Sequence, residues 1–146
     1  MQQPSPSAVF QARSRARRYA MQALYQWQVG RQDIDDIERQ FKADYDMSNV
    51  DVEYLHELLQ ATRRAEALEA LSAPLLDRPV RELDPVERAI LLIGTYELND
   101  RPDVPYRVVI NEAVRLAKTF GALEGYKYVN GVLDKLAGRL RPREKA

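Results

Sequence analysis

The side chains best suited to chemistry in this sequence are arginines grouped near its start. Residues 1–32 hold five basic side chains and no acidic one, a local charge of +5. A guanidinium group presents a planar fork of donors that binds phosphate at two points and stacks on bases. Phosphate contacts of this kind give affinity with little sequence information. The members of this cluster that we expect to bind RNA are Arg13, Arg15, Arg17 and Arg18.

A purely structural role for the same arginines remains open. Residues 33–57 carry nine acidic side chains against two basic ones, a local charge of −7. Runs of like charge are common on protein surfaces. The arginines could therefore form a solvated helix end that pairs with this acidic stretch.

A second candidate lies near the end of the chain, where Tyr126 and Tyr128 flank Lys127 at the start of a predicted helix. Exposed aromatic rings beside cations hold unpaired bases by stacking. The alternative is that a tyrosine packs in the core with its hydroxyl satisfied at the rim. Gly131 follows inside the predicted helix, where glycine costs about 1 kcal/mol relative to alanine. Its presence suggests the close approach of another helix or of a partner.

Signals for catalysis or metal binding are weak. His56, the only histidine, has Glu53 and Glu57 as sequence neighbours and could form a metal site or an acid–base pair. One histidine without cysteine is a poor ligand set. No phosphate-binding glycine loop or nucleophile elbow is present. We therefore predict no enzymatic activity, no metal and no cofactor.

The composition of the whole chain limits its class. A chain of 146 residues that is 45% hydrophobic and 30% charged is typical of one globular domain. Lysine and arginine total 22, as do aspartate and glutamate, a balance that argues against indiscriminate nucleic-acid binding. The neutral total nevertheless hides basic ends, because the residues after Leu136 add a local charge of +3.

The location of the protein follows from what the sequence lacks. Cysteine is absent, which fits a reducing compartment. No apolar run approaches the roughly 18 residues that span a bilayer, and the start does not resemble a signal peptide. We expect a soluble, cytoplasmic protein without membrane contact.

The candidate binding residues are expected to lie on helices. Apolar residues recur at three- and four-residue steps, and no window alternates as a strand would, so we predict an all-α domain of about seven helices. The stretch 50–71 is expected to be the longest helix, and polar tails at about 1–8 and 140–146 are expected to be flexible. The predicted helices are about 10–29, 33–41, 50–71, a short one within 74–79, 84–98, 105–121 and 123–137.

Four segments together resemble the NusB family of transcription antitermination factors. The match runs in order through nearly the whole chain. The resemblance implies one compact all-helical domain, residues 1–146, built as two packed bundles, without enzymatic activity. The segments are RARRYAMQALYQWQ at 15–28, LDPVERAILLIGTYEL at 83–98, DVPYRVVINEAVRLAKTFG at 103–121 and YVNGVLDKL at 128–136.

The resemblance also implies partners. Members of the family bind the boxA element of ribosomal RNA leader transcripts together with NusE, a small-subunit ribosomal protein. The pair joins elongating RNA polymerase with other Nus factors, suppresses premature termination and assists ribosomal RNA maturation.

Family site positions can be carried over residue by residue. The basic RNA-binding segment falls on Arg13, Arg15 and Arg17, and Arg18 stands where some relatives are acidic. The aromatic RNA contact, often Phe in the family, corresponds to Tyr128, beside Lys127, with the preceding acidic position at Glu124. The surface facing NusE corresponds to Glu82 and Glu87, and Arg81 stands where relatives have a second acidic residue.

Two other classes of function remain open. Some family members form homodimers, so the basic ends could serve only to hold a structural homodimer together. A NusB-like domain also occurs at the front of some ribosomal RNA cytosine methyltransferases, which would make this chain an RNA-targeting accessory domain. Because the sequence has no glycine-rich cofactor loop and no cysteine nucleophile, we do not expect a complete methyltransferase.

Overall fold

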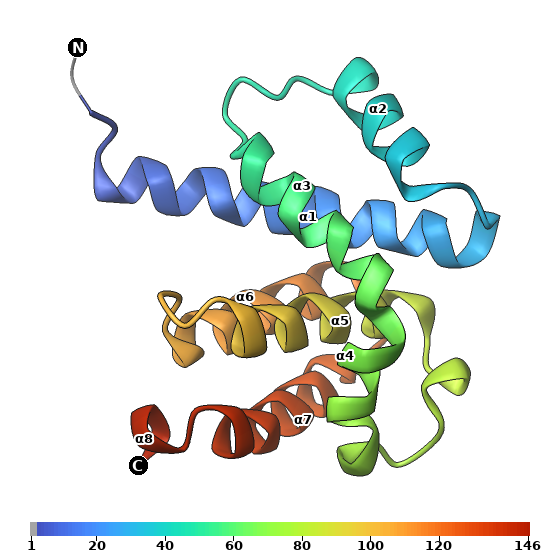
Figure 1. Cartoon of the computed structure of the whole chain (residues 1–146), viewed down its shortest axis with the longest axis vertical. Helices are drawn as coiled ribbons and strands as arrows, with labels where there is room; N and C mark the ends of the chain where they lie inside the picture. Colours follow the sequence, from blue (N-terminus) through green and yellow to red (C-terminus); the bar gives the residue numbers. More distant parts are fainter. Residues whose placement is uncertain (1–2) are drawn as a thin grey trace. The chain divides into compact units, whose positions relative to one another are not determined.

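Helices make up the regular structure of the chain (Figure 1). The structure, a computed structural model, describes residues 3–146, and this part contains no strand. The predicted all-α class is confirmed. The helices are α1 (Pro6–Gly30), α2 (Ile34–Asp44), α3 (Val52–Gln60), α4 (Ala65–Ser72), α5 (Pro85–Asp100), α6 (Tyr106–Phe120), α7 (Gly125–Leu140) and α8 (Pro142–Lys145), with 3₁₀ turns η1 (Ala61–Arg64), η2 (Ala73–Leu75) and η3 (Val80–Glu82).

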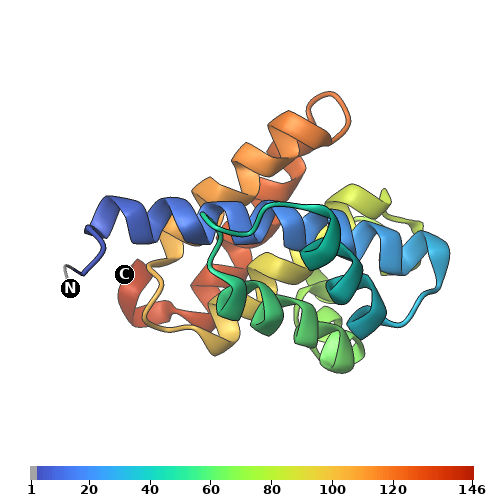
Figure 2. The same ribbon diagram turned by 90° about the horizontal axis from the view of Figure 1, so that it is seen from above.

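The chain divides into two compact units, one ending at Thr62 and the other running from Arg63 to Ala146. In the first unit, α1 packs against α2 and α3 (Figure 2). The buried face of α1 includes the small residues Ala16, Ala20 and Ala23, which are fully buried, beside the larger Met21 and Leu24.

The ends of α1 are set by local chemistry. Ser5 is the N-cap, and its Oγ accepts a hydrogen bond from the Ala8 N–H at 3.1 Å. Pro6 then occupies the first turn, where its missing N–H is harmless, so the helix begins earlier than the predicted start near residue 10. The predicted N-terminal tail also includes residues 1–2, which lie outside the described residues. Arg31 closes the helix in a left-handed conformation with φ of 55°.

The prediction of one long helix over 50–71 is wrong. The 3₁₀ turn η1 separates α3 from α4, and α1 is longer than either. The Thr62 hydroxyl donates to the Leu59 carbonyl at 2.8 Å, a local bond that competes with regular helical geometry. Arg64 then leaves the helical region, with φ of −120° and ψ of 20°.

In the second unit, α5, α6 and α7 pack against one another, and α4 packs against α5. Every residue from Ala89 to Thr95 is buried, as expected for a central helix. The predicted start of α5 is confirmed, because Asp84 Oδ1 accepts the Val86 N–H at 2.8 Å and Pro85 follows it. Gly121 ends α6 as predicted. The predicted stop at Gly138 is wrong, because α7 continues to Leu140 and is capped by Arg141.

Arg141 is a buried hydrogen-bond centre in this unit. Four backbone carbonyls at the end of α5 and in the following loop accept from its guanidinium, at 2.8–3.0 Å. Carbonyls in the last turn of a helix lack partners within the helix, so Arg141 both caps α5 and closes the α5–α6 connection. The acceptors are the carbonyls of Glu97, Leu98, Arg101 and Val104.

The C-terminal stretch that the sequence predicts to be a tail thus contains an anchored side chain. Glu144 Oε1 accepts from Arg141 at 2.6 Å, and Glu144 Oε2 accepts the Tyr106 N–H at 2.9 Å. These bonds lower the pKa of Glu144, the Tyr106 N–H contributing most. Among residues 3–146, no helix combines the length and apolar character needed to cross a membrane.

We expect Arg141→Ala to lower the free energy of unfolding by about 3 kcal/mol, because several buried carbonyls lose a charged donor together. Urea denaturation followed by circular dichroism measures this change. Exposed Arg143 provides the matched control, and Arg143→Ala should stay within about 0.5 kcal/mol of the native protein. Equal stability of the two variants would refute the capping role of Arg141.

Candidate nucleic-acid interface

The four arginines near the start of α1 divide into two pairs. Side chains three or four residues apart share a face of a helix. Arg13 and Arg17 therefore lie on one face, and Arg15 and Arg18 on another. Arg15 and Arg18 are exposed, Arg13 is half-buried and Arg17 is only 2% exposed. The cluster in the sequence is therefore not a single surface in the structure.

The Arg13 and Arg17 pair packs on Tyr54 of α3. Their guanidinium carbons lie 4.6 and 5.4 Å from the centre of the Tyr54 ring. Such cation–π contacts stabilise a helix pair from within. Arg13 also pairs with Asp51 at 3.6 Å, so the proposed pairing with the acidic stretch occurs at this arginine. Arg17 is too buried in this structure to reach an RNA phosphate.

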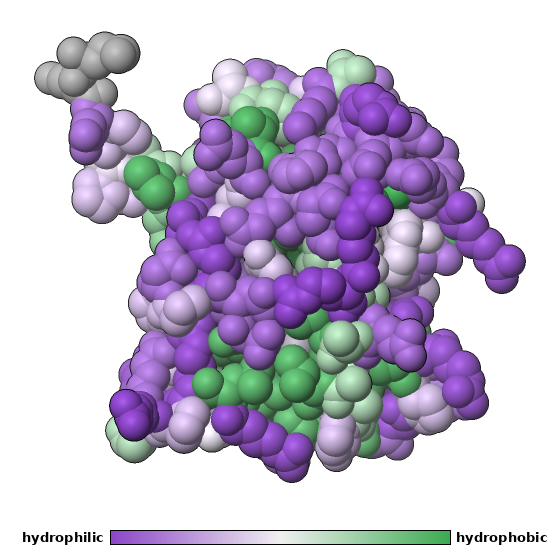
Figure 3. Space-filling view, viewed as in Figure 1, coloured by the Kyte–Doolittle hydropathy of each residue, from purple (hydrophilic) through white to green (hydrophobic). Residues whose placement is uncertain are grey.

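The Arg15 and Arg18 pair faces solvent beside the loop that joins α2 to α3. Arg15 Nη1 donates to the Asn49 carbonyl at 3.3 Å, which orients the guanidinium without burying it. In the view of Figure 3, hydrophilic side chains cover most of the surface, and the main hydrophobic area lies in its lower part. Arg15 and Arg18 are therefore the arginines of the cluster best placed to contact phosphate.

The Tyr-Lys-Tyr segment forms the first turn of α7 in the second unit. Glu124 precedes it in a left-handed conformation, with φ of 64°, and Lys127 Nζ lies 3.1 Å from Glu124 Oε1. Leu123 is 97% exposed. Tyr126 is half-buried, with Lys118 Nζ 4.8 Å from its ring centre. Lys127 and Glu124 thus form an exposed ion pair beside two half-buried rings.

Tyr128 is held by a segment far away in the sequence. Its hydroxyl accepts the Asp77 N–H at 3.2 Å across 51 residues. The Arg78 guanidinium lies 5.5 Å from the ring centre. Burial raises the pKa of the Tyr128 hydroxyl. Tyr128 therefore has a satisfied hydroxyl, as the packing alternative requires, and a ring that is only partly buried, while its stacking on a base stays a prediction.

Sequence reasoning missed Asp77 and Arg78. Arg78 also forms an ion pair with Asp77 at 2.7 Å, which lowers the pKa of Asp77. The sequence predicts only a short linking helix there, and no local pattern indicates a contact with a residue at the start of α7. The contact between this segment and Tyr128 can be recognised only in the structure, where η2 and α4 pack against α7.

Glu87 lies next to the same turn. It is 8% exposed, and a Cβ on Gly125 would lie 2.1 Å from Glu87 Oε1, so a larger residue there would require the Glu87 carboxylate to shift. Burial raises the pKa of Glu87, the negative charge of Asp84 adds to this effect and Arg78 opposes it. The structure thus brings the residue predicted to face NusE into contact with the turn predicted to face RNA. Glu82, the other predicted NusE contact, is exposed in η3.

Gly131 is exposed in the middle of α7. A Cβ at this position would meet no atom within 4 Å. Approach by another helix is therefore the wrong explanation for this glycine among the described residues. Approach by a partner stays a prediction.

His56 has a structural neighbour rather than a ligand set. Its Nδ1 lies 2.8 Å from Glu38 Oε1, and Lys42 Nζ donates to Glu38 Oε2 at 2.6 Å. The contact links α2 to α3. Over residues 3–146, no group of three or more His, Cys, Asp or Glu side chains is arranged to hold a metal ion.

Within residues 3–146, the candidate residues are thus exposed arginines on α1 in the first unit and partly buried tyrosines at the start of α7 in the second. The NusB family model matches residues 14–138. The chain belongs to the NusB family, and the resemblance noted in its sequence is confirmed.

Individual relatives agree with this assignment. The chain is 55% identical over 139 residues to the transcription antitermination protein NusB of Marinomonas sp., covering 93% of this chain and 80% of the relative. It is 53% identical over 135 residues to the protein of the same name from Edwardsiella ictaluri, covering 92% and 97%. The solved structure of T. maritima NusB superposes with a TM-score of 0.80 at 30% identity, covering 99% of this chain and 98% of that one.

The buried Glu87 carboxylate yields a pH-dependent prediction. A raised pKa in the folded state means that ionisation of Glu87 disfavours folding, so its cost to stability grows as the pH rises through and above the ordinary glutamate range. Glu87→Gln cannot ionise, so its stability relative to the native protein should increase between about pH 4 and about pH 7. Urea denaturation at both pH values measures the change.

Exposed Glu82 is the control for this experiment. The stability difference between Glu82→Gln and the native protein should stay nearly constant over the same interval. A difference for Glu87→Gln that stays flat or falls with rising pH would contradict the role of burial.

Proposed function

We propose that this protein is a non-catalytic transcription antitermination factor. In this proposal it binds the boxA element of ribosomal RNA leader transcripts together with the ribosomal protein NusE. The complex joins elongating RNA polymerase with other Nus factors and supports processive transcription and maturation of ribosomal RNA. Membership of the NusB family, whose relatives carry the name transcription antitermination protein, is the observation that carries the proposal.

The RNA contacts in this proposal are divided between the units. Arg15 and Arg18 of α1 bind phosphates, while Arg13 and Arg17 position α1 through Tyr54. Lys127 supplies a cation at the start of α7, Tyr128 supplies a stacking face, and Glu124 orients Lys127. Phosphate contacts give affinity and stacking holds an unpaired base.

The partner contacts rest on acidic residues. Ribosomal proteins are generally basic because they bind RNA, and exposed Glu82 offers a carboxylate to such a partner. Glu87 is mostly covered, so its role in the proposal is to support the turn at Gly125 that carries Tyr128. Substitution of Glu82 is therefore expected to weaken NusE binding directly. Substitution of Glu87 is expected to weaken the binding of both NusE and RNA.

The overall test is binding of a boxA-like single-stranded RNA with and without NusE, combined with light scattering. The proposal predicts weak binding alone, a strong gain with NusE and a heterodimer of the two proteins. A stable homodimer that binds neither NusE nor RNA would refute it in favour of a structural role.

The exposed arginine pair is tested by the double variant Arg15→Ala/Arg18→Ala. Each phosphate contact removed should lower the logarithmic salt slope of RNA binding by roughly 0.7. Arg31→Ala/Arg39→Ala removes the same charge from elsewhere in the first unit and should leave most of the slope. Fluorescence anisotropy across a salt series measures both. An unchanged slope for the first variant would exclude Arg15 and Arg18 as phosphate ligands.

Buried Arg17 behaves differently in this proposal. Arg17→Ala should reduce stability rather than the salt slope, because its guanidinium contacts Tyr54 and not solvent. This variant therefore separates a positioning arginine from a binding one.

The ring of Tyr128 is tested by comparing two substitutions. Tyr128→Ala should weaken RNA binding by about 1–3 kcal/mol through the loss of a stacking face. Tyr128→Phe keeps the ring and removes only the hydroxyl that accepts from Asp77, so its RNA affinity should remain near that of the native protein. Titration calorimetry gives the affinities, and circular dichroism checks that helix content is kept. Equal losses for both variants would assign the effect to the hydroxyl instead.

A further inference from the structure

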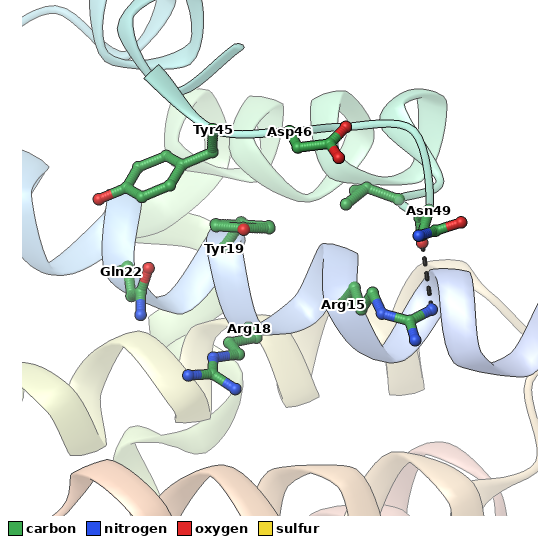
Figure 4. Close-up of a pocket in the computed structure, with 8 residues that line it drawn as sticks. Arg15, Arg18, Tyr19, Gln22, Tyr45, Asp46 and Asn49 are labelled. Carbon is green, nitrogen blue, oxygen red and sulfur yellow. Dashed lines mark hydrogen bonds between the residues drawn. The ribbon is translucent and has the colours of Figure 1, made fainter. Parts of the chain in front are cut away.

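A cavity of about 460 Å³ lies in the first unit, between α1 and the loop that follows α2 (Figure 4). Its volume is in the range of sites that hold a small ligand. Neither the sequence motifs nor the family resemblance points to it as a whole. The lining residues are Arg15, Arg18, Tyr19 and Gln22 of α1 and Tyr45, Asp46, Asn49 and Val50 from the end of α2 and the loop.

One wall of the cavity is aromatic. The rings of Tyr19 and Tyr45 are 5.2 Å apart and tilted by 41°, and Phe41 contacts both from the buried side. Tyr45 is 47% exposed, so part of its ring remains open to a ligand while the rest is fixed by its neighbours. A fixed, exposed ring is a stacking surface for a nucleobase.

The acidic group of the cavity and its basic groups come from different elements. Figure 4 shows Asp46 on the loop side and Arg15, Arg18 and Gln22 on the α1 side. Asp46 Oδ1 accepts the Ser48 N–H at 2.9 Å, and bonds to Ser48 lower the pKa of Asp46. The carboxylate is therefore ionised at neutral pH and can only accept hydrogen bonds.

An acceptor-only group discriminates among the four bases. Guanine presents two adjacent donors, N1–H and the N2 amino group, which match the two oxygens of a carboxylate. Adenine and cytosine present a ring-nitrogen acceptor beside their amino group, and uracil presents one N–H between two carbonyls. Only guanine offers the carboxylate a pair of neighbouring donors.

We propose that this cavity is a subsite for one guanine nucleotide of single-stranded RNA. The base stacks on Tyr45, its Watson–Crick edge faces Asp46, and Arg15 and Arg18 bind the adjoining phosphate. The inference rests on the proposed RNA-binding function and adds base selectivity to arginines that would otherwise contact phosphate alone.

The test uses single-stranded RNA heptamers of uridine with one central guanosine, adenosine or inosine, at low ionic strength where phosphate contacts are strongest. The guanosine heptamer should bind about tenfold more tightly than the adenosine heptamer. Inosine keeps N1–H but lacks the N2 amino group, so it should fall between them. Fluorescence anisotropy with the full-length protein gives the three affinities.

Matched variants connect this preference to the cavity. Asp46→Asn replaces an acceptor-only group with an amide and should reduce the preference for guanosine to within about twofold. Asp44→Asn removes a neighbouring exposed carboxylate outside the cavity and should leave the preference intact. Tyr45→Ala should weaken all three heptamers, and Tyr45→Phe should restore them.

The outcomes separate the subsite from the wider proposal. Equal binding of guanosine and adenosine heptamers, with a salt slope that still depends on Arg15 and Arg18, overturns the subsite and leaves RNA binding standing. A preference that survives Asp46→Asn also overturns the subsite. Failure of every RNA to bind, boxA with NusE included, overturns both. Free GTP is a separate arm, and competition by GTP at or below the heptamer concentration would assign the cavity to a free nucleotide and overturn the RNA subsite.

Discussion

The helical period of α1 is the constraint on which the candidate interface depends. The face of α1 on which Ala16 and Ala20 are buried fixes the orientation of every other side chain on the helix. Arg17 is thereby directed onto Tyr54, while Arg15 and Arg18 are directed to solvent. One run of arginines thus supplies both a more buried pair and an exposed pair, because a step of one or two residues changes the face on which a side chain lies.

In the second unit, the buried carboxylate of Glu87 contributes to the packing around the start of α7. Glu87 fits against the backbone at Gly125 because no side chain occupies that space, and Asp77 and Arg78 hold Tyr128 nearby. Burial disfavours the ionised form of this carboxylate and raises the pKa of Glu87. Glu87 lies beside the turn that carries the partly buried ring of Tyr128, so the electrostatics of that turn and the packing of α5 are linked.

What the sequence predicts well is local. The start of α5 at Asp84–Pro85 and the stop of α6 at Gly121 depend on capping chemistry within a few residues, and both are confirmed. The break between α3 and α4 at Thr62 involves a hydrogen bond from its side chain, which the spacing of apolar residues does not predict. In the site, residue types indicated where arginines and tyrosines gather, but burial of Arg17 and the bond across 51 residues to Tyr128 are properties of packing. Such contacts have no signature in a single sequence.

The neutral net charge of the chain can be interpreted from the places where its charged side chains lie. A neutral total keeps general attraction to polyanions small, so in the proposed function the affinity for RNA comes from local contacts such as those of Arg15 and Arg18. The cavity beside Arg15 and Arg18 contains the ionised carboxylate of Asp46. That negative charge repels a phosphate and weakens binding that lacks base contacts. In the proposed subsite, the carboxylate favours binding only where a base supplies donors to it, so Asp46 would lower general affinity and make the surface around Arg15 and Arg18 selective.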